Sequence, residues 1–458
     1  MRVTLSEIVR AAGGTLLCGQ EDTVITAFAT DSREVKPGIM FVPIRGEKTD
    51  GHRYIEKAFE NGGAASFTEE DVRTEQKVTW ENRPLILVDD CRAALQKTAA
   101  WYRSQFTIPV VGITGSVGKT TAKEMVAQAL SAAGNVHKTA GNQNSQVGVP
   151  ITVCGLRKEH IAAVVEMGVS MPGEMERIAA VVKPTCAVMT NIGVSHIEFM
   201  KTRENILAEK AHIADYLPAD GVLFVNGDDD LLPGLKKTSP HKVVTFGIVS
   251  PCDWSASDLR ETDEGTFFTC TGPGGEHQEL FVPAAGRHNV RNALAAFAVA
   301  RTLKVPAGDA ARAIGAYQAP AMRQQIFECG GLTLIDDSYN ASPDSMRSAI
   351  DVLTTRNNSG KTAAVLADML ELGDFSAKGH FEVGAYAKEK GVDLLVAVGE
   401  LAKEIAAGYG QNAVWFATNE EAGEFLKEKL QPGDAVLVKG SRSMKTDEIV
   451  SSLKEFFS

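Results

Sequence analysis

The fold of this chain is decided by the stretch P-V-V-G-I-T-G-S-V-G-K-T-T at residues 109–121, which continues into A-K-E-M-V-A-Q-A-L at residues 122–130. The stretch begins as an apolar run, passes through a glycine-containing turn and ends in a helical pattern. A strand, a glycine turn and a helix in this order form a cradle whose backbone N–H groups bind phosphate oxygens. The stretch therefore predicts a nucleoside triphosphate site.

The motif is present in a short form, T-G-S-x-G-K-T-T, because the strict form requires glycine where Ile113 stands. Short forms occur by chance, and an ordinary strand-to-helix turn with a solvated lysine is the alternative. The flanking strand and helix favour the phosphate site. In such a site Lys119 would reach the outer phosphates, and Thr120 would offer its hydroxyl to Mg²⁺.

Composition limits the class of protein. The 458 residues suffice for about three domains, and 44% hydrophobic with 23% charged residues is typical of a globular chain. No apolar run approaches the roughly 18 residues of a membrane span, and the first ten residues have the pattern of an amphipathic helix, not of a signal peptide. A net charge of −11 disfavours nucleic acid and membrane surfaces as partners. Seven scattered cysteines without a C-x-x-C pair favour a cytoplasmic location.

Strand and helix patterns predict an α/β chain of three units. Residues 1–83 alternate short apolar runs with helical patterns. Residues 84–317 begin with a leading helix and then contain five runs typical of buried parallel strands, at 108–114, 161–167, 186–192, 221–226 and 242–247. Residues 253–281 have the alternation of antiparallel strands at a sheet edge. Residues 318–458 contain four more strand runs, at 332–336, 362–366, 394–398 and 435–438, which predict a second doubly wound, Rossmann-like sheet.

Three polar side chains follow central strands or lie close behind them. Glu166 ends a predicted strand at the edge where parallel sheets bind ligands, so its carboxylate could bind Mg²⁺ or serve as a cap or surface group. His196 lies in the loop after the next strand, where a structural role is more common than a catalytic one. Lys210 has the pattern of a solvated helix lysine. The residues alone leave these roles open.

Two further clusters have two interpretations each. Asn289 and Asn292 stand before an alanine-rich helix, where asparagine commonly caps, although its amide also matches the hydrogen-bonding edge of adenine. The segment D-D-S-Y-N at residues 336–340 follows the first strand of the third unit, where a doubly wound domain presents ligand groups. It could equally be a turn before a helix with Pro343 in its first turn.

The order of the motifs resembles the Mur ligase family, whose members build peptidoglycan precursors. The motifs are T-G-S-V-G-K-T-T (114–121), G-N-Q-N-S-Q-V-G-V-P (141–150), V-V-E-M-G (164–168), T-N-I-G-V-S-H (190–196), G-R-H-N-V-R-N-A-L-A-A (286–296), D-D-S-Y-N-A-S-P-D-S-M (336–346) and V-K-G-S-R-S-M (438–444). D-S-R (31–33), P-G-I-M-F (37–41) and D-G-H (50–52) extend the resemblance over the whole chain. The motifs of the third unit resemble the branch that adds a dipeptide.

The resemblance implies a reaction. ATP and two Mg²⁺ ions would convert the terminal carboxylate of UDP-N-acetylmuramoyl-tripeptide into an acyl phosphate. The amine of D-alanyl-D-alanine would then form the amide bond, giving UDP-MurNAc-pentapeptide, ADP and phosphate. The first domain would bind the UDP-substrate, the central domain ATP, and the C-terminal domain ATP and the dipeptide, in a cytoplasmic monomer. Closure of the domains would assemble the site and exclude water.

The same resemblance implies roles for individual residues. ATP would be bound by Gly115, Ser116, Val117, Gly118, Lys119, Thr120 and Thr121, by Asn289 and Asn292 on the adenine side, by Arg323 near the phosphates and by Asp337 near the ribose. The catalytic set would be Lys119, Glu166, His196 and Lys210, with Thr120 and Glu166 on one Mg²⁺, His196 on the second, and Lys210 carried as N6-carboxylysine. The UDP-substrate would meet Ser32, Arg33, Gly46, Asp50 and His52, and the dipeptide Tyr339, Asn340, Lys439 and Arg442.

Within the metal site that the resemblance implies, charge gives a physical reason for a modified Lys210. An ammonium would repel Mg²⁺, whereas a carbamate offers the oxygen ligands that a hard cation prefers. Two positions depart from the family pattern: Ser145 stands where a second asparagine is usual, and His212 where glutamate is common. A sister ligase that adds a single amino acid, a folate-type polyglutamate ligase and a P-loop regulatory module without ligase activity remain as alternatives.

Overall fold

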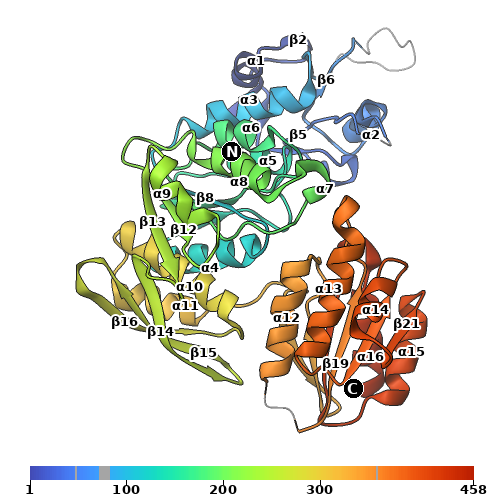
Figure 1. The fold of residues 1–458 in the computed structure, drawn as a ribbon. Coiled ribbons are helices and arrows are strands. Elements are labelled where there is room, and N and C mark those ends of the chain that lie inside the picture. Colours follow the sequence, from blue (N-terminus) through green and yellow to red (C-terminus); the bar gives the residue numbers. More distant parts are fainter. Residues whose placement is uncertain (47–48, 72–82, 357–358) are drawn as a thin grey trace.

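The computed structural model describes residues 1–46, 49–71, 83–356 and 359–458. Within these residues three larger sheets follow one another along the chain (Figure 1). The unit drawn in orange and red lies beside the central unit, and the blue N-terminal unit packs on the opposite end of that central unit. The α/β class with three units is thus confirmed. Among the helices of the described ranges, none has both the length and the hydrophobicity that a membrane crossing requires.

The first unit contains a five-stranded sheet in the order β2-β7-β6-β5-β4, in which β2 is antiparallel and the other neighbours are parallel. Its strands are β2 (Thr15–Cys18), β4 (Ala27–Ala29), β5 (Ile39–Phe41), β6 (Ala65–Thr68) and β7 (Leu85–Leu87), and β1 (Val3–Thr4) pairs separately with β3 (Val24–Ile25). Helix α1 (Leu5–Ala12) starts with a capping box between Thr4 and Glu7 and ends at the left-handed Gly13. Helix α2 (Ile55–Glu60) lies between β5 and β6 in the chain.

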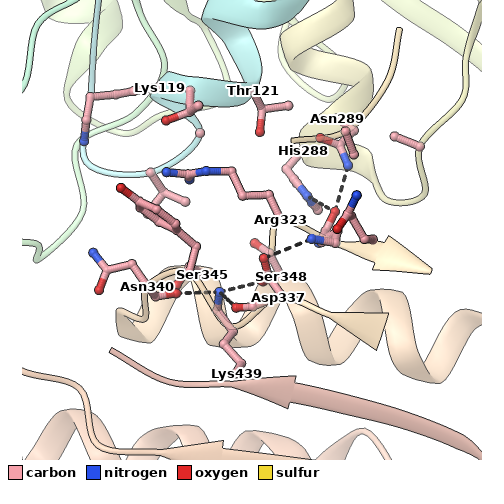
Figure 2. A pocket seen from close by; sticks show the side chains of 18 of the residues that line it. Lys119, Thr121, His288, Asn289, Arg323, Asp337, Asn340, Ser345, Ser348 and Lys439 are labelled. Carbon is pink, nitrogen blue, oxygen red and sulfur yellow. Dashed lines mark hydrogen bonds and ion pairs between the residues drawn. The ribbon is translucent and has the colours of Figure 1, made fainter. Parts of the chain in front are cut away.

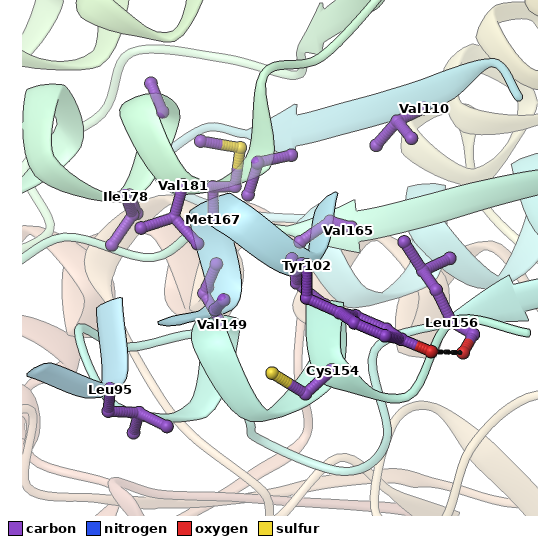
Figure 3. Packing of buried hydrophobic residues seen from close by; sticks show 14 of the residues in the cluster. Leu95, Tyr102, Val110, Val149, Cys154, Leu156, Val165, Met167, Ile178 and Val181 are labelled. Carbon is purple, nitrogen blue, oxygen red and sulfur yellow. Dashed lines mark hydrogen bonds between the residues drawn. The ribbon is translucent and has the colours of Figure 1, made fainter. Parts of the chain in front are cut away.

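The division expected at residue 83 cuts through this sheet, because β7 pairs with both β2 and β6. The chain leaves the first unit through helix α3 (Cys91–Arg103), which contacts α1 as well as α5 (Gly148–Cys154) and α6 (Glu174–Val182) of the central unit. Figure 3 shows Leu95 and Tyr102 of α3 among apolar side chains of the central unit, and the Tyr102 hydroxyl donates to the carbonyl oxygen of Leu156 at 2.9 Å. The two units therefore share one hydrophobic core.

The central unit is a nine-stranded sheet in the order β16-β15-β14-β13-β12-β11-β8-β10-β9. Neighbours from β9 to β14 are parallel, and β15 and β16 continue the sheet in antiparallel fashion at its edge. The strands are β8 (Val110–Thr114), β9 (Val136–Lys138), β10 (Ala162–Glu166), β11 (Cys186–Met189), β12 (Val222–Asn226), β13 (Lys242–Gly247), β14 (Trp254–Thr262), β15 (Gly265–Gly272) and β16 (Glu276–Val282). The five predicted buried strands and the antiparallel edge are confirmed, whereas β9 was not predicted.

Helices cover both faces of this sheet, which explains why its strands are continuously apolar. Val110 of β8 belongs to the core on the side of α3, α5 and α6, and Val111 belongs to the core on the opposite side. The second face is covered by α4 (Lys119–Ser131), α10 (Arg287–Thr302) and α11 (Ala307–Gly315), and the first face also carries α8 (Arg203–Ala211). The shorter helices α7 (Ile197–Met200) and α9 (Leu235–Thr238) follow strand ends.

The third unit is a six-stranded sheet in the order β17-β18-β22-β19-β20-β21, parallel except for β17. Its strands are β17 (Gln325–Cys329), β18 (Leu332–Asp336), β19 (Thr362–Ala367), β20 (Leu394–Val398), β21 (Ala413–Phe416) and β22 (Ala435–Lys439). Its helices are α12 (Pro343–Thr355), α13 (Ser376–Glu389) and α14 (Lys403–Tyr409) on one core, and α15 (Asn419–Lys429) and α16 (Asp447–Phe457) on the other. The predicted doubly wound sheet is confirmed, and the edge strands β17 and β21 are additions to it.

Candidate active site

The phosphate-binding turn connects β8 to α4. Gly115 has φ 145°, and a Cβ atom at this position would lie 1.9 Å from Oγ1 of Thr190, so only glycine fits. Gly118, with φ 81°, is the residue before α4, and no side chain of the described residues caps the helix. The N–H groups of its first turn are therefore available for an anion.

Asn191, in the loop after β11, holds this turn in place. Its backbone oxygen accepts from the N–H of Ser116 at 3.0 Å, and its Oδ1 accepts from the N–H of Val117 at 2.8 Å. The hydroxyl of Ser116 in turn accepts from the N–H of Gly193 at 2.9 Å. The loop that the sequence singled out for His196 alone thus also supports the phosphate-binding turn.

Lys119 lies folded over the turn. Its ammonium donates to the carbonyl oxygens of Gly115 at 2.8 Å and Ser116 at 3.2 Å. Burial lowers the pKa of Lys119, the Glu166 carboxylate opposes this shift, and the Arg323 guanidinium adds to it. Lys119 in the first turn of α4 and Arg323 close enough to affect its charge favour a polyanionic ligand.

Glu166 and Thr120 meet beside the turn. The Thr120 hydroxyl donates to Oε1 of Glu166 at 3.1 Å, and the Asn144 amide donates to the same oxygen at 2.8 Å. Glu166 is 2% exposed, and its Oε2 is buried without a hydrogen-bond partner among the described residues. Carboxylate and hydroxyl oxygens are ligands that Mg²⁺ prefers, so this unpartnered oxygen fits a divalent cation.

Lys123 is a buried cation that the sequence did not reveal. It is 1% exposed, donates to the carbonyl oxygen of Thr139 at 2.9 Å, and pairs with Glu124 at 2.8 Å. Its Nζ lies 4.0 Å from Oε2 of Glu166. Lys123 therefore places a cation within ion-pair distance of the oxygen of Glu166 that has no hydrogen-bond partner.

His196 lies at the boundary between the central and third units. Its backbone is left-handed, with φ 61°, and its Nδ1 lies 2.6 Å from Oε2 of Glu371, which follows β19. The contact is an ion-pair contact by distance and does not have the geometry of a hydrogen bond. This contact lowers the pKa of the Glu371 carboxyl. Glu371 had no signal in the sequence, because its partner belongs to another unit.

Lys210 is buried, with 2% of its surface exposed, so it is not a solvated helix lysine. Burial lowers the pKa of Lys210 far below its usual value, and the Lys119 ammonium adds to this shift. The neighbouring Glu209 accepts from the N–H groups of Gly173 and Met175 at 2.7 Å each, so its carboxylate is engaged at the start of α6. The Glu209 carboxylate opposes the shift, but burial and Lys119 outweigh it, so the site disfavours a charged ammonium at Lys210.

The departure from the family pattern at His212 lies outside this cluster, because Nδ1 of His212 pairs with Asp215 at 2.6 Å near the surface. Ser145, the other departure, lines the cavity described below, and its hydroxyl lies within hydrogen-bond distance of two N–H groups at the start of α5.

The two asparagines lie inside α10 and not before it, because the helix already starts at Arg287. Neither caps the helix, so that alternative is wrong. The Asn289 amide donates to the carbonyl oxygen of Ala285 at 2.8 Å and to Oε1 of Gln324 at 2.9 Å. The Asn292 amide lies against Gly118, since a Cβ atom there would be 3.5 Å from it. Gln324 was not among the predicted residues.

The third unit contributes the opposite wall (Figure 2). The Arg323 guanidinium lies 4.0 Å from the centre of the Tyr339 ring. Lys439 is 3% exposed, and its ammonium donates to Oδ2 of Asp337 at 2.5 Å and to the carbonyl oxygen of Asn340 at 2.9 Å. Lys439 therefore stabilises the loop that contains Asp337 and Tyr339.

A cavity of about 920 Å³ joins the two walls, a size that suits a small-molecule ligand. The central unit lines it with Ser116, Val117, Gly118, Lys119, Thr120, Thr121, Glu166, His196 and Asn289, and the third unit with Arg323, Asp337, Tyr339, Asn340 and Lys439. Gly115, Lys210, Asn292 and Arg442 are not among the lining residues. Arg442 is half-exposed and pairs with Asp447 at 3.0 Å.

The candidate UDP-substrate residues lie in the first unit and do not line this cavity. They are Ser32, Arg33, Gly46, Asp50 and His52. Arg33 pairs with Asp31 at 2.6 Å. Nδ1 of His52 lies 2.6 Å from Asp50, and its Nε2 accepts from the N–H of Glu69 at 3.1 Å. The loop between Gly46 and Asp50 includes residues 47 and 48, which lie outside the described residues.

Three family models match the chain in sequence order. "Mur ligase family, catalytic domain" matches residues 24–103, "Mur ligase middle domain" residues 113–300, and "Mur ligase, glutamate ligase domain" residues 322–442. The UDP-N-acetylmuramoyl-tripeptide–D-alanyl-D-alanine ligase of Bacillus subtilis (strain 168) is 37% identical over 459 residues, which cover 99% of this chain and 98% of that relative. This chain belongs to the Mur ligase family.

Solved structures of this family have the same fold. MurF from Acinetobacter baumannii superimposes with a TM-score of 0.91 at 30% identity, covering 99% of each chain. MurF ligase from Thermotoga maritima, in complex with ADP, superimposes with a TM-score of 0.82 at 28% identity, covering 94% of this chain and 97% of that one. The family resemblance drawn from the motifs is confirmed.

Proposed function

We propose that this Mur ligase joins D-alanyl-D-alanine to UDP-N-acetylmuramoyl-tripeptide at the expense of ATP. The observation that carries the proposal is the cavity in which the phosphate-binding turn, Glu166 and His196 face Arg323 and Asp337 of the third unit. The near full-length similarity to a relative that bears the name of this ligase supports the dipeptide as acceptor.

The reaction has two steps. A terminal carboxylate oxygen of the tripeptide attacks the γ-phosphorus of ATP, the bond to the β,γ-bridging oxygen breaks, and ADP leaves. The amine of D-alanyl-D-alanine then attacks the acyl carbon, loses a proton and expels inorganic phosphate, which leaves UDP-MurNAc-pentapeptide. The first step brings two anions together, so the site acts mainly by neutralising charge and aligning the reactants.

ATP would lie along the cavity with its phosphates on residues 115–121. Lys119 now donates to carbonyl oxygens of its own turn and would exchange them for phosphate oxygens. Asn289 and Asn292 would lie on the adenine side, and Asp337 beside the ribose. The Thermotoga maritima relative was solved in complex with ADP, which supports a nucleotide ligand for this chain.

The residues present fit Mg²⁺. Thr120 and Glu166 would hold one ion, because they supply a hydroxyl and a buried carboxylate with a free oxygen. His196 would hold a second ion. When bound, the ions would neutralise charge on the transferring phosphoryl group.

Lys210 would act as a carbamate. Burial and the Lys119 ammonium lower the pKa of its amine, which favours the unprotonated form that adds to CO₂ with loss of one proton. The product would be an anion beside Lys119, where the unmodified pair can only repel. The carbamate would complete the oxygen ligands around the second ion.

The remaining assignments follow the three units. Ser32, Arg33, Gly46, Asp50 and His52 would meet the UDP-substrate, and Tyr339 and Asn340 the dipeptide, with Lys439 and Arg442 behind their loop. We place the first domain boundary near residue 90 instead of 83, because β7 belongs to the first sheet, and retain 318 for the second. The chain would work as a cytoplasmic monomer.

Omission of substrates in turn tests this proposal. Phosphate release and amide formation are measured with ATP, Mg²⁺, either the L-lysine or the meso-diaminopimelate tripeptide, and D-alanyl-D-alanine. We expect both products only when every substrate is present. Use of a single amino acid in place of the dipeptide would indicate a sister ligase, and use of a folate would indicate a polyglutamate ligase. Phosphate release that ignores both peptide partners would favour a regulatory ATP-binding module.

A further inference from the structure

The third unit contacts the central unit at the loop that carries His196. Oε2 of Glu371 lies 2.6 Å from Nδ1 of His196. A Cβ atom at Gly193 would lie 2.1 Å from Oδ2 of Asp344, and one at Gly373 would lie 3.0 Å from the side chain of Glu198. Residues 193–198 are therefore a docking surface for the third unit.

We infer that Glu371 is a positioning residue that orients the imidazole of His196 toward the metal. A carboxylate beside Nδ1 favours the tautomer with the proton on that nitrogen, which leaves the lone pair of Nε2 free for a cation. The inference rests on the proposed function and extends it, because it takes a residue of the third unit into a metal site of the central unit.

The two partners belong to different units. On one side, the N–H of Met369 donates to Nε2 of the buried His380, and the N–H of Leu370 donates to the hydroxyl of Ser441, each at 2.9 Å. Leu372 on the other side of Glu371 is buried in the core of the third unit. Glu371 must therefore move with the third unit.

His196 moves with the phosphate-binding turn, because Asn191 and Gly193 of the same loop hydrogen-bond Ser116. Both His196 and Glu371 have left-handed backbones, with φ 61° and 63°. Residues other than glycine rarely adopt a left-handed backbone, so the surrounding structure must stabilise this conformation at both positions. The contact thus joins two fixed loops and forms only when the third unit docks on the central unit.

The imidazole is oriented for the second cation only in the docked arrangement, so ATP would not be fully activated while the third unit is displaced. The competing interpretation is a surface ion pair without effect, since Glu371 is 52% exposed and such pairs contribute little. Metal binding distinguishes the two.

The experiment measures how many Mn²⁺ ions the protein binds in the presence of ADP at fixed pH. The electron paramagnetic resonance signal gives free Mn²⁺, and the difference from total Mn²⁺ gives the bound ions. We expect Glu371→Ala to weaken binding of the second Mn²⁺ by about 10- to 100-fold. Glu371→Gln should weaken it less, because an amide oxygen still places a negative partial charge beside Nδ1. The control is Asp374→Asn, in the exposed turn η7 (Gly373–Phe375) of the same loop, which should bind Mn²⁺ like the wild type. In a His196→Ala background, Glu371→Ala should add no further loss.

Unchanged affinity for the second Mn²⁺ in Glu371→Ala would overturn the inference. So would an equal further loss in the His196→Ala background, since Glu371 would then act elsewhere, and so would a wild type that binds a single Mn²⁺. The proposed function is judged separately by amide formation. If the wild-type enzyme forms the amide but Glu371→Ala binds Mn²⁺ with unchanged affinity, this inference is wrong and the proposed function is unaffected.

Discussion

Gly193 offers a sharp test of how the third unit docks. Gly193→Ala places a Cβ atom 2.1 Å from Oδ2 of Asp344 and 3.4 Å from Cβ of Ser116. The backbone of Gly193 does not have a positive φ, so alanine is compatible with its conformation. The perturbation therefore acts through the contact between two units and not through strain within the loop.

The size of the effect follows from this overlap. Contacts of a real Cβ atom below 3.0 Å are essentially unknown, so Asp344 or the whole third unit must retreat by roughly 1 Å. Asp344 lies in the first turn of α12, and its Oδ2 is buried without a hydrogen-bond partner among the described residues. Overpacking of this kind costs about 1–3 kcal/mol, which corresponds to a decrease in docking of about 5- to 150-fold.

The assay is ATP-dependent amide formation, with unfolding in urea as a control for stability. We expect kcat/KM of Gly193→Ala to decrease about 5- to 150-fold, in proportion to the loss of docking, while the central unit stays folded. Asp344→Ala removes the opposing oxygen, so the double variant should recover most of the lost activity. Wild-type kinetics of Gly193→Ala, or a double variant no better than Gly193→Ala alone, would refute this account of the interface.

Other perturbations probe the chemistry and the fold. Lys210→Met should lower amide formation about 100-fold or more, and full activity of this variant would exclude a carbamate role. Glu166→Gln should weaken Mg²⁺-dependent ADP binding at least about tenfold, as calorimetry would show. Lys439→Met leaves the buried side of Asp337 unpaired and should lower the free energy of unfolding, measured in urea, by about 3–5 kcal/mol. At Asp228 burial alone would raise the pKa, but backbone N–H groups and an arginine outweigh it and lower the pKa to about 2. Its stabilisation is thus present above pH 4 and lost as the pH falls toward 2, so Asp228→Asn should flatten the acid unfolding curve in that window.

Much of the fold could be predicted because buried parallel strands leave a continuous apolar run. The run at 109–113 is one example, since alternate residues of β8 face two different cores. Short edge strands leave no such signal, and β9, β17 and β21 were therefore not predicted. Strand β7 was assigned to the wrong unit because sequence order does not show which neighbours a strand pairs with.

The candidate site was predictable where a motif fixes local geometry. The phosphate-binding turn, Glu166 at the end of β10 and the loop after β11 are of this kind, because each functional group follows directly from a strand end. Lys123 and Glu371 were not predictable, since their meaning depends on partners that are distant in sequence. The burial of Lys210 was also hidden, because a lysine in an amphipathic pattern is usually solvated.

The charges of the site impose an order on its assembly. Lys119 and Lys210 are both buried and repel each other, and burial lowers the pKa of each. Conversion of Lys210 to an anion removes that repulsion and leaves Lys119 cationic for the phosphates. The carbamate should therefore form before ATP binds, because a bound polyanion would make a second anion beside it harder to form. Preincubation with bicarbonate should then shorten the lag before amide formation, whereas bicarbonate added after ATP should not.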